Sequence, residues 1–296
     1  SLGGCLSWAT MALQPGASEP CVFVANLHVR KCAGTSVRSM FTHMPEWEQS
    51  GMYCSPMSAH ASDPNNRAGR HWSETHCDED MGHFNDGVRE LRKQLEPEGC
   101  KVISTLLLRN PVEQLADEWL YFNGEENKKG TANPVEWSKN APENMLRWLI
   151  GGQSQLWREV PPPVEKTLID CNTTMEYVSG QFDQIDLVGT MDTTENFAAW
   201  WIALGDMAGF NAHCSSGAAG VQCGAPDHSN RHAPPTDPIA QAANLTRAQH
   251  DEVLQRNRCG QRVRDEAWSR FNATHGPLSS DVDAKDPFAG GLAMGA

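Results

Sequence analysis

The chain has 296 residues, and 24 lysines and arginines against 37 aspartates and glutamates give it a formal net charge of −13 at pH 7. Its composition, 39% hydrophobic and 21% charged, is that of a globular protein. The acidic balance argues against nonspecific nucleic-acid binding, which depends on lysine and arginine. The longest nearly apolar run, residues 102–108, is far shorter than the roughly 20 residues of a membrane helix. We expect neither a nucleic-acid partner nor a membrane-spanning segment, and the composition leaves the oligomeric state open.

Both ends of the chain lack the patterns of regular elements. Residues 1–20 are rich in Gly, Ser, Ala and Pro, and residues 276–296 show no periodic apolar pattern. We expect flexible tails there and one folded domain over residues 21–275. The chain opens without the basic segment and apolar core of a signal peptide, so we expect that any targeting segment is missing from it.

The first two predicted units each consist of a buried strand followed by a helix. Residues 21–28 form a continuous apolar run, which is typical of a strand buried on both faces, and a helix should follow from about Thr35. Residues 101–108 repeat this pattern. An amphipathic helix over 112–122 comes next, with Pro111 at a position that helix starts favour. Both units therefore fit a parallel sheet.

A third unit has the same order. It consists of a strand over 185–189, a capping sequence and a helix over 197–202. A long, mostly polar helix or helix pair is predicted over 245–271, with Asn244 or Thr246 as its cap.

The stretches between the units carry weaker signals. Residues 53–70 are predicted as a loop, and residues 123–141 as an insertion before a short helix over 143–150. Three strand-then-helix units predict an α/β fold in three layers, with a central parallel sheet flanked by helices.

The turn after the first strand, residues 28–38, carries the first candidate site. Lys31 stands at the end of the strand, and Gly34 precedes the hydroxyls of Thr35 and Ser36 at a helix N-terminus. Backbone N–H groups, a positive charge and hydroxyl donors are what a phosphate needs. The pattern is not a Walker A motif, because the lysine precedes the glycine by three residues. An ordinary capped helix start is the alternative interpretation.

Arg109 marks the second candidate site. It directly follows the predicted strand over 101–108 and precedes Asn110 and Pro111. Ligands of open α/β sheets bind at the carboxyl ends of the strands. We therefore expect Arg109 and the turn 28–38 at the same ligand-binding edge.

Together the two sites resemble the sulfotransferases that use 3′-phosphoadenosine 5′-phosphosulfate (PAPS), in particular the Golgi carbohydrate group that includes the heparan sulfate O-sulfotransferases. In that group the first strand runs into a P-K-x-x-G-T/S-T/S turn and a later strand into R-D-P-V/I-x-R. The corresponding residues here are 30–36 and 109–114. Three weaker matches follow in the family's order at 143–149, at 186–197, and at Asn257 with Ala267. The resemblance covers about residues 21–272.

The resemblance implies a P-loop-NTPase-like sulfotransferase fold with PAPS as co-substrate and no metal. Lys31 would lie against the oxygen that bridges phosphate and sulfate. Loop N–H groups and the hydroxyls of Thr35 and Ser36 would hold the 5′-phosphate. Arg109 would pair with the 3′-phosphate. The residues that the resemblance places around the cofactor are Arg30, Lys31, Cys32, Ala33, Gly34, Thr35, Ser36, Arg109 and Asp117.

Transfer to an alcohol also needs a general base, and histidine is the usual choice. His76 stands in the string T-H-C-D, which is similar to the H-x-D stretch that carries the catalytic histidine in the 6-O-sulfotransferases. We predict His76 and Lys31 as the catalytic residues. The alternative bases are His71, His83 and Glu74.

Two residues depart from the family pattern. Arg30 replaces the proline before the lysine and adds positive charge near the phosphosulfate. Asp117 stands where the family has a serine that donates to the 3′-phosphate. A carboxylate at about 4 Å from a phosphate charge costs roughly 1 kcal/mol in water-like surroundings and roughly 4 kcal/mol at an effective dielectric of about 20. Three outcomes are open: Asp117 points away, it is held by a cation such as Arg147, or cofactor binding is impaired.

The sequence therefore predicts an enzyme that transfers a sulfuryl group from PAPS to a hydroxyl of a carbohydrate or other alcohol. The alternative is a catalytically impaired binding protein on the same fold, motivated by Asp117. A phosphoryl-transfer enzyme is disfavoured, because the sequence Gly-Lys-Ser/Thr and a magnesium-binding carboxylate at a strand end are missing. The net charge of −13 fits a neutral sugar or a small alcohol acceptor at least as well as a polyanionic glycan.

The cysteines and glycosylation sequons bear on the compartment. Ten cysteines include no C-x-x-C pair, so no structural zinc site is predicted. Three N-x-S/T sequons begin at Asn172, Asn244 and Asn272. Cys214 and Cys223 bracket a loop of small residues that a disulfide would close. We expect a glycoprotein of the Golgi lumen or a secreted one.

Overall fold

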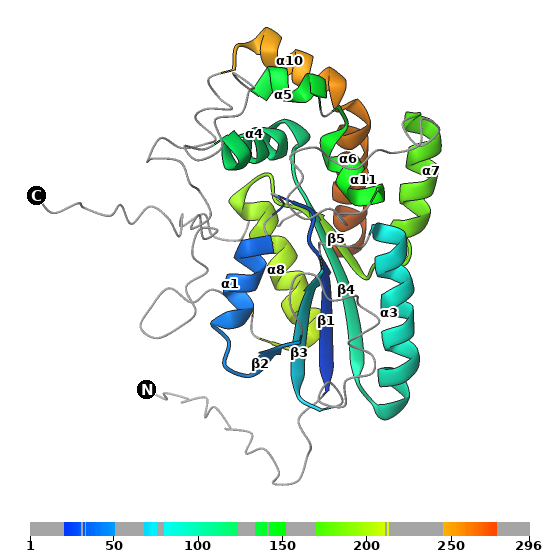
Figure 1. Cartoon of the computed structure of the whole chain (residues 1–296). Helices are drawn as coiled ribbons and strands as arrows, with labels where there is room; N and C mark the ends of the chain where they lie inside the picture. Colours follow the sequence, from blue (N-terminus) through cyan, green and yellow to red (C-terminus); the bar gives the residue numbers. More distant parts are fainter. Residues whose placement is uncertain are drawn as a thin grey trace, which may run out of the picture.

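The structure is a computed structural model, and Figure 1 shows its course. It describes residues 21–30, 32, 34–50, 68–75, 80–123, 134–140, 142–151, 170–210, 212 and 245–276. Among the helices of these ranges, none has both the length and the apolar character that crossing a membrane requires.

The centre of the fold is a parallel sheet of five strands in the order β2-β3-β1-β4-β5. Every residue of β1 is buried, as the continuous apolar run predicted. Leu27 at the end of β1 is level with Thr75 in β3 and with Leu106 in β4, so the three strands end near one another. The strands are β1 (Val22–Leu27), β2 (Trp47–Gln49), β3 (Arg70–Thr75), β4 (Lys101–Leu108) and β5 (Leu187–Thr190).

Helices cover both faces of the sheet, with α1 and α8 on one side and α3, α7 and α11 on the other (Figure 1). Alternate residues of β1 contact the two helical layers: Phe23 belongs to the apolar cluster with α3 and α11, and Val24 to the cluster with α1 and α8. The predicted three-layer α/β fold is confirmed. The helices are α1 (Gly34–Thr42), α3 (Met81–Leu95), α4 (Pro111–Asn123), α5 (Pro134–Asn140), α6 (Asn144–Ile150), α7 (Cys171–Phe182), α8 (Thr194–Ala208), α10 (Arg247–Arg256) and α11 (Arg258–His275), with a short 3-10 turn at Glu96–Glu98.

Local capping explains where several of these helices begin. The side chain of Asp80 accepts a hydrogen bond from the amide of His83 at the start of α3. Thr193 caps α8 in the same way, and Thr246 forms a capping box with Gln249 at the start of α10. Helix α4 begins at Pro111, as its position before the amphipathic stretch predicted.

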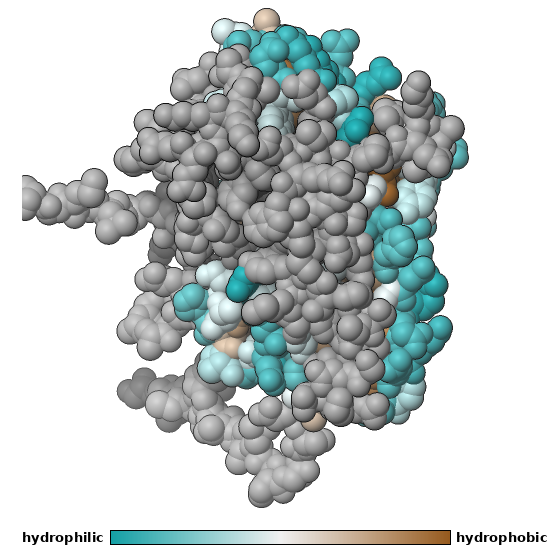
Figure 2. All heavy atoms as spheres, in the orientation of Figure 1, coloured by the Kyte–Doolittle hydropathy of each residue, from teal (hydrophilic) through white to brown (hydrophobic). Residues whose placement is uncertain are grey.

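Helix α3 shows how the outer layer separates core from solvent. Its apolar residues are buried against the sheet, whereas His83, Asp86, Arg89 and Lys93 are exposed. Figure 2 shows the resulting hydrophilic band along this side of the molecule. This spacing of polar residues is that of an amphipathic helix on a sheet.

Two disulfides join segments that are far apart in the sequence. Cys21 and Cys100, which precede β1 and β4, are linked with a Cα–Cα distance of 4.4 Å. Cys171 at the start of α7 is linked to Cys259 near the start of α11, with a Cα–Cα distance of 5.1 Å. The expected pair Cys214 and Cys223 lies outside the described residues.

The carboxylate of Glu143 lies beside the disulfide of Cys171 and Cys259, so that three residues of types that can bind a metal ion lie together. Both sulfurs are consumed by the disulfide, and Glu143 accepts hydrogen bonds from the amides of Cys259 (3.0 Å) and Gly260 (2.9 Å). The carboxylate therefore serves the N-terminus of α11. Burial raises the pKa of Glu143, and these two hydrogen bonds act in the opposite direction.

Candidate active site at the carboxyl edge of the sheet

Three ionisable side chains lie at the carboxyl edge of the sheet. His28 directly follows β1, Glu74 is the last residue but one of β3, and Arg109 directly follows β4. The amide of His28 donates to the carbonyl of Thr75 at 2.9 Å, which ties the end of β1 to the end of β3. Because parallel sheets bind ligands at this edge, we take it as the candidate site.

His28 and Glu74 form a buried pair at this edge. The imidazole Nδ1 lies 2.5 Å from Oε1 of Glu74, and the two side chains are only 13% and 2% exposed. The other oxygen, Oε2, is also buried, and within the described parts of the chain no group donates a hydrogen bond to it. A buried acceptor of this kind is costly unless a ligand or water serves it. The pair can hold a proton taken from a hydroxyl.

The imidazole of His28 packs directly on Gly34, the first residue of α1. A Cβ atom built at position 34 would fall within the His28 ring. Glycine at this position therefore brings the histidine–glutamate pair against the predicted phosphate-binding turn. The pair and the turn are therefore in direct contact, through the His28 ring and the backbone of Gly34.

The structure describes the predicted turn in part. Lys31 and Ala33 lie outside the described residues, as does the side chain of Thr35. Ser36 is buried in the first turn of α1. Cys32 is also buried, and its amide donates to the carbonyl of Val29 at 3.1 Å. Burial raises the pKa of the Cys32 thiol, although the nearby charge of Arg109 acts to lower it.

The predicted bases have different places. His76 lies outside the described residues. His71 is near the start of β3, where its ring nitrogens contact Ser50 Oγ and the carbonyl of Ala68, so it is remote from the carboxyl edge of its own strand. His83 is an exposed residue beside Asp80 at the start of α3. Among these alternatives, Glu74 is the one that the described structure places at the sheet edge.

Arg30 is held by α4 and α6. Its guanidinium lies 4.2 Å from the centroid of the Trp148 ring, and its carbonyl accepts a hydrogen bond from Gln114 Nε2 at 3.0 Å. Stacking of a guanidinium on an indole is favourable and orients the arginine. Arg30 is therefore held by helices outside the sheet.

A fully buried carboxylate, Glu118, connects these supports. Its Oε1 accepts a hydrogen bond from Trp148 Nε1 (3.1 Å). Its Oε2 accepts from Asn144 Nδ2 (2.5 Å) and Gln114 Nε2 (3.1 Å). The network positions the indole under Arg30 and the amide that holds the Arg30 carbonyl. This network was not predicted from the sequence, although the spacing of Gln114 and Glu118 places both on one face of α4.

Arg109 is enclosed by acidic residues of α4. Its Nε donates to Glu113 Oε2 at 3.1 Å, and its Nη1 donates to Asp117 Oδ2. The Arg109 side chain is 8% exposed. Burial acts to lower the pKa of Arg109, but the charges of Asp117 and Glu113 outweigh burial and raise it. Arg147 was one cation expected from the sequence to hold Asp117, whereas its Nε donates to the carbonyl of Pro142 at 2.8 Å.

The turn between β4 and α4 is also tied to the end of β5. Asp192 Oδ1 accepts from the amide of Asn110 at 2.6 Å, and Oδ2 accepts from Arg264 Nε of α11 at 2.7 Å. The side-chain oxygen of Asn110 caps α4 by accepting from the amide of Val112 at 2.9 Å. These contacts hold Arg109 and the first turn of α4 in a defined position.

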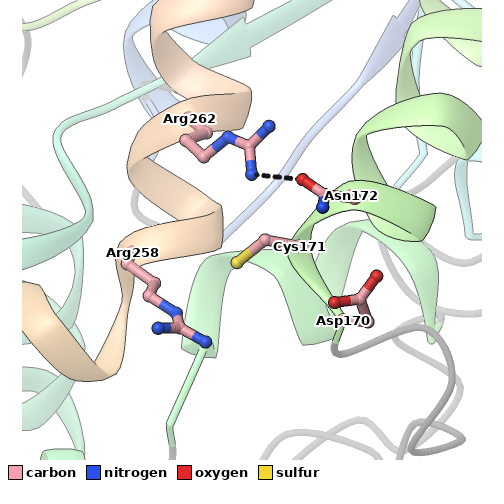
Figure 3. Close-up of a pocket in the computed structure, with 5 residues that line it drawn as sticks. All are labelled: Asp170, Cys171, Asn172, Arg258 and Arg262. Atoms are coloured by element: carbon pink, nitrogen blue, oxygen red, sulfur yellow. Dashed lines mark hydrogen bonds between the residues drawn. The ribbon is translucent and has the colours of Figure 1, made fainter.

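A cavity of about 370 Å³ lies away from the sheet edge, where α7 and α11 begin (Figure 3). It is lined by Asp170, Cys171, Asn172, Arg258 and Arg262. Arg262 donates to the side-chain oxygen of Asn172 at 3.1 Å, and the carboxylate of Asp170 caps α7. Its polar side chains are exposed and serve local contacts, whereas the sheet edge holds buried charged groups.

No family model matches the chain, and no curated protein matches it. Among solved structures, the chain is similar to mouse sulfotransferase SULT7A1 complexed with PAP, with 11% sequence identity and a TM-score of 0.38. The similarity covers 83% of this chain and 88% of that chain. A likeness this distant carries no argument about activity.

Proposed function

We propose that this protein is a sulfotransferase that moves a sulfuryl group from a nucleoside 5′-phosphosulfate to a hydroxyl acceptor at the carboxyl edge of the sheet. One observation carries the proposal: the buried pair of His28 and Glu74 packs on Gly34 of the turn that resembles a 5′-phosphosulfate loop. This contact brings a proton acceptor next to the segment expected to hold the phosphosulfate.

The proposed reaction assigns the proton to Glu74. Its open oxygen, Oε2, accepts the hydrogen of the acceptor hydroxyl, while Oε1 stays beside the His28 imidazole. The hydroxyl oxygen attacks sulfur, and the bond between sulfur and the bridging oxygen breaks. The nucleotide leaves with that electron pair on its 5′-phosphate, which Lys31 and the N-terminus of α1 stabilise.

The donor that the resemblance implies is PAPS, and the acceptor class is a glycan or a small alcohol. We further propose a lumenal or secreted location, either in the Golgi or outside the cell. The two long-range disulfides support an oxidising compartment, because such bonds are rare in reducing ones. Asn172, the first residue of one sequon, is exposed.

A transfer assay tests this proposal and separates the candidate bases. Radiolabelled sulfate is offered as nucleoside phosphosulfate with a panel of glycans and small alcohols. Glu74→Gln should lower the transfer rate at least about a hundredfold, the usual scale for a general base. Glu48→Gln on β2 is the matched control, because this glutamate is exposed. If His76→Ala abolishes transfer and Glu74→Gln does not, the base is His76. If the folded parent transfers nothing from any nucleoside phosphosulfate, the proposal fails.

The second candidate is a binding protein on the same fold. It is favoured by the pairing of Arg109 with Asp117, because this arginine is the residue expected to bind the 3′-phosphate. It predicts that the protein binds an acceptor glycan without transferring sulfate to it.

A further inference from the structure

The cluster formed by Arg109, Glu113 and Asp117 sets what this site can accept at the 3′ position of a nucleotide. The guanidinium donates to one carboxylate through Nε and to the other through Nη1. The carboxylates are 31% and 17% exposed, so both are partly shielded from water. One positive and two negative charges leave the cluster with a net charge of about −1.

Glu113 and Asp117 share one side of α4, about one helical turn apart. Arg109 lies in the turn just before the helix, four residues before Glu113. The helix start is capped by Asn110 and tied to Asp192, which fixes the position of Arg109. A rotation of one side chain therefore leaves the other carboxylate on the guanidinium.

Other cations do not take over Asp117 in the described part of the chain. Arg147 donates to the carbonyl of Pro142, and Arg264 donates to Asp192 and Asp265. Asp117 therefore stays paired with Arg109, the arginine that would meet the nucleotide. A 3′-phosphate would meet a guanidinium whose Nε and Nη1 already donate to carboxylates, and two carboxylates whose negative charge repels it.

A ribose hydroxyl meets a different environment at the same place. A hydroxyl is a hydrogen-bond donor, and a carboxylate accepts such a bond well. Dinucleotide sites use this chemistry to choose between a free ribose hydroxyl, bound by an acidic residue, and a phosphorylated one, bound by arginine. We propose, on the basis of the sulfotransferase function above, that Glu113 and Asp117 select a phosphosulfate donor with a free 3′-hydroxyl and disfavour one with a 3′-phosphate.

Two nucleotides that differ only in the 3′-phosphate test this inference directly. AMP and adenosine 3′,5′-bisphosphate are titrated into the full chain, and the dissociation constants are measured by calorimetry. The parent protein should bind AMP at least about tenfold more tightly than the bisphosphate. Asp117→Ser should strengthen bisphosphate binding by about ten- to a thousandfold, and AMP binding should change less than about threefold. The size follows from the removal of one like charge at about 4 Å.

Two further variants make the outcome decisive. Asp117→Asn keeps the shape of the side chain and should also strengthen bisphosphate binding. Glu176→Gln, an exposed change on α7, should leave both constants unchanged. Tighter binding of the bisphosphate than of AMP by the parent overturns the selection but keeps the proposed function. If neither the parent nor the two Asp117 variants bind either nucleotide while circular dichroism shows them folded, the proposed function fails and the inference fails with it.

Discussion

Glu118 lies fully buried on α4, and we expect Glu118→Gln to weaken the fold and the support of Arg30 together. The substitution keeps the size of the side chain but turns one of its two acceptor oxygens into a donor. The carboxylate now accepts from Trp148, Asn144 and Gln114 at 2.5–3.1 Å. Whichever way the new amide turns, its N–H group faces at least one donor.

The magnitude follows from how the new amide turns. An oxygen at the Oε2 position keeps the hydrogen bonds from Asn144 and Gln114, whereas an oxygen at the Oε1 position keeps the one from Trp148. The amide will therefore favour facing Asn144 and Gln114 with its oxygen, and the indole N–H of Trp148 is left opposite an N–H group. One buried unsatisfied donor costs about 1–3 kcal/mol, so we expect the free energy of unfolding to fall by about 2 kcal/mol.

Thermal unfolding followed by circular dichroism measures this loss. A domain of this size loses about 2–4 °C per kcal/mol, so the melting temperature should fall by about 4–8 °C. Glu176→Gln on α7 is the matched control, because the same change at an exposed residue should alter stability by less than about 0.5 kcal/mol. A melting temperature for Glu118→Gln that equals the control, or exceeds the parent, would show that this network does not hold the helices as described.

Three further predictions concern the cysteines and one histidine. Replacing both Cys171 and Cys259 by serine should lower the free energy of unfolding by about 4–5 kcal/mol in urea titrations, because the disulfide closes a loop of 88 residues; a loss below about 1 kcal/mol would contradict this. Iodoacetamide at pH 8 should leave Cys32 unmodified in the folded protein and label it after unfolding, since burial raises its pKa; peptide mapping reads the outcome. Burial lowers the pKa of His275 below 6.5, so the unfolded chain binds its proton more tightly and stability should fall as the pH drops below about 6.5. His275→Gln should reduce that fall, and identical pH profiles would refute the assignment.

The strands that the sequence revealed are those buried on both faces. β1 and β4 are continuous apolar runs, and both were predicted nearly to their ends. β3 was missed because its six residues include Arg70, His71 and Glu74, and β2 was missed because it has three residues. Buried polar residues interrupt the apolar pattern by which a strand is recognised in a sequence. In β3 one of them, Glu74, also belongs to the candidate site.

The sequence indicated which residues belong to the candidate site, but not which of them contact one another. Motif order singled out Arg109, Asp117 and the turn before α1, and the resemblance named Glu74 among the bases. The partners of these residues depend on strand order and helix register, which bring His28 to Glu74 and Asp117 to Arg109. The two disulfides were not predicted either, because ten cysteines allow many connectivities and the fold decides which cysteines meet.

The close contact of His28 with Gly34 has a consequence for how related chains can differ. Position 34 can gain a side chain only if the ring at position 28 moves away or is lost, because the two would otherwise occupy the same space. The two positions should therefore covary, and an alanine at 34 should be tolerated best together with a small residue at 28. Since a small residue at 28 would also leave Glu74 without its imidazole, such a joint change would remove the proton-holding pair in one evolutionary step.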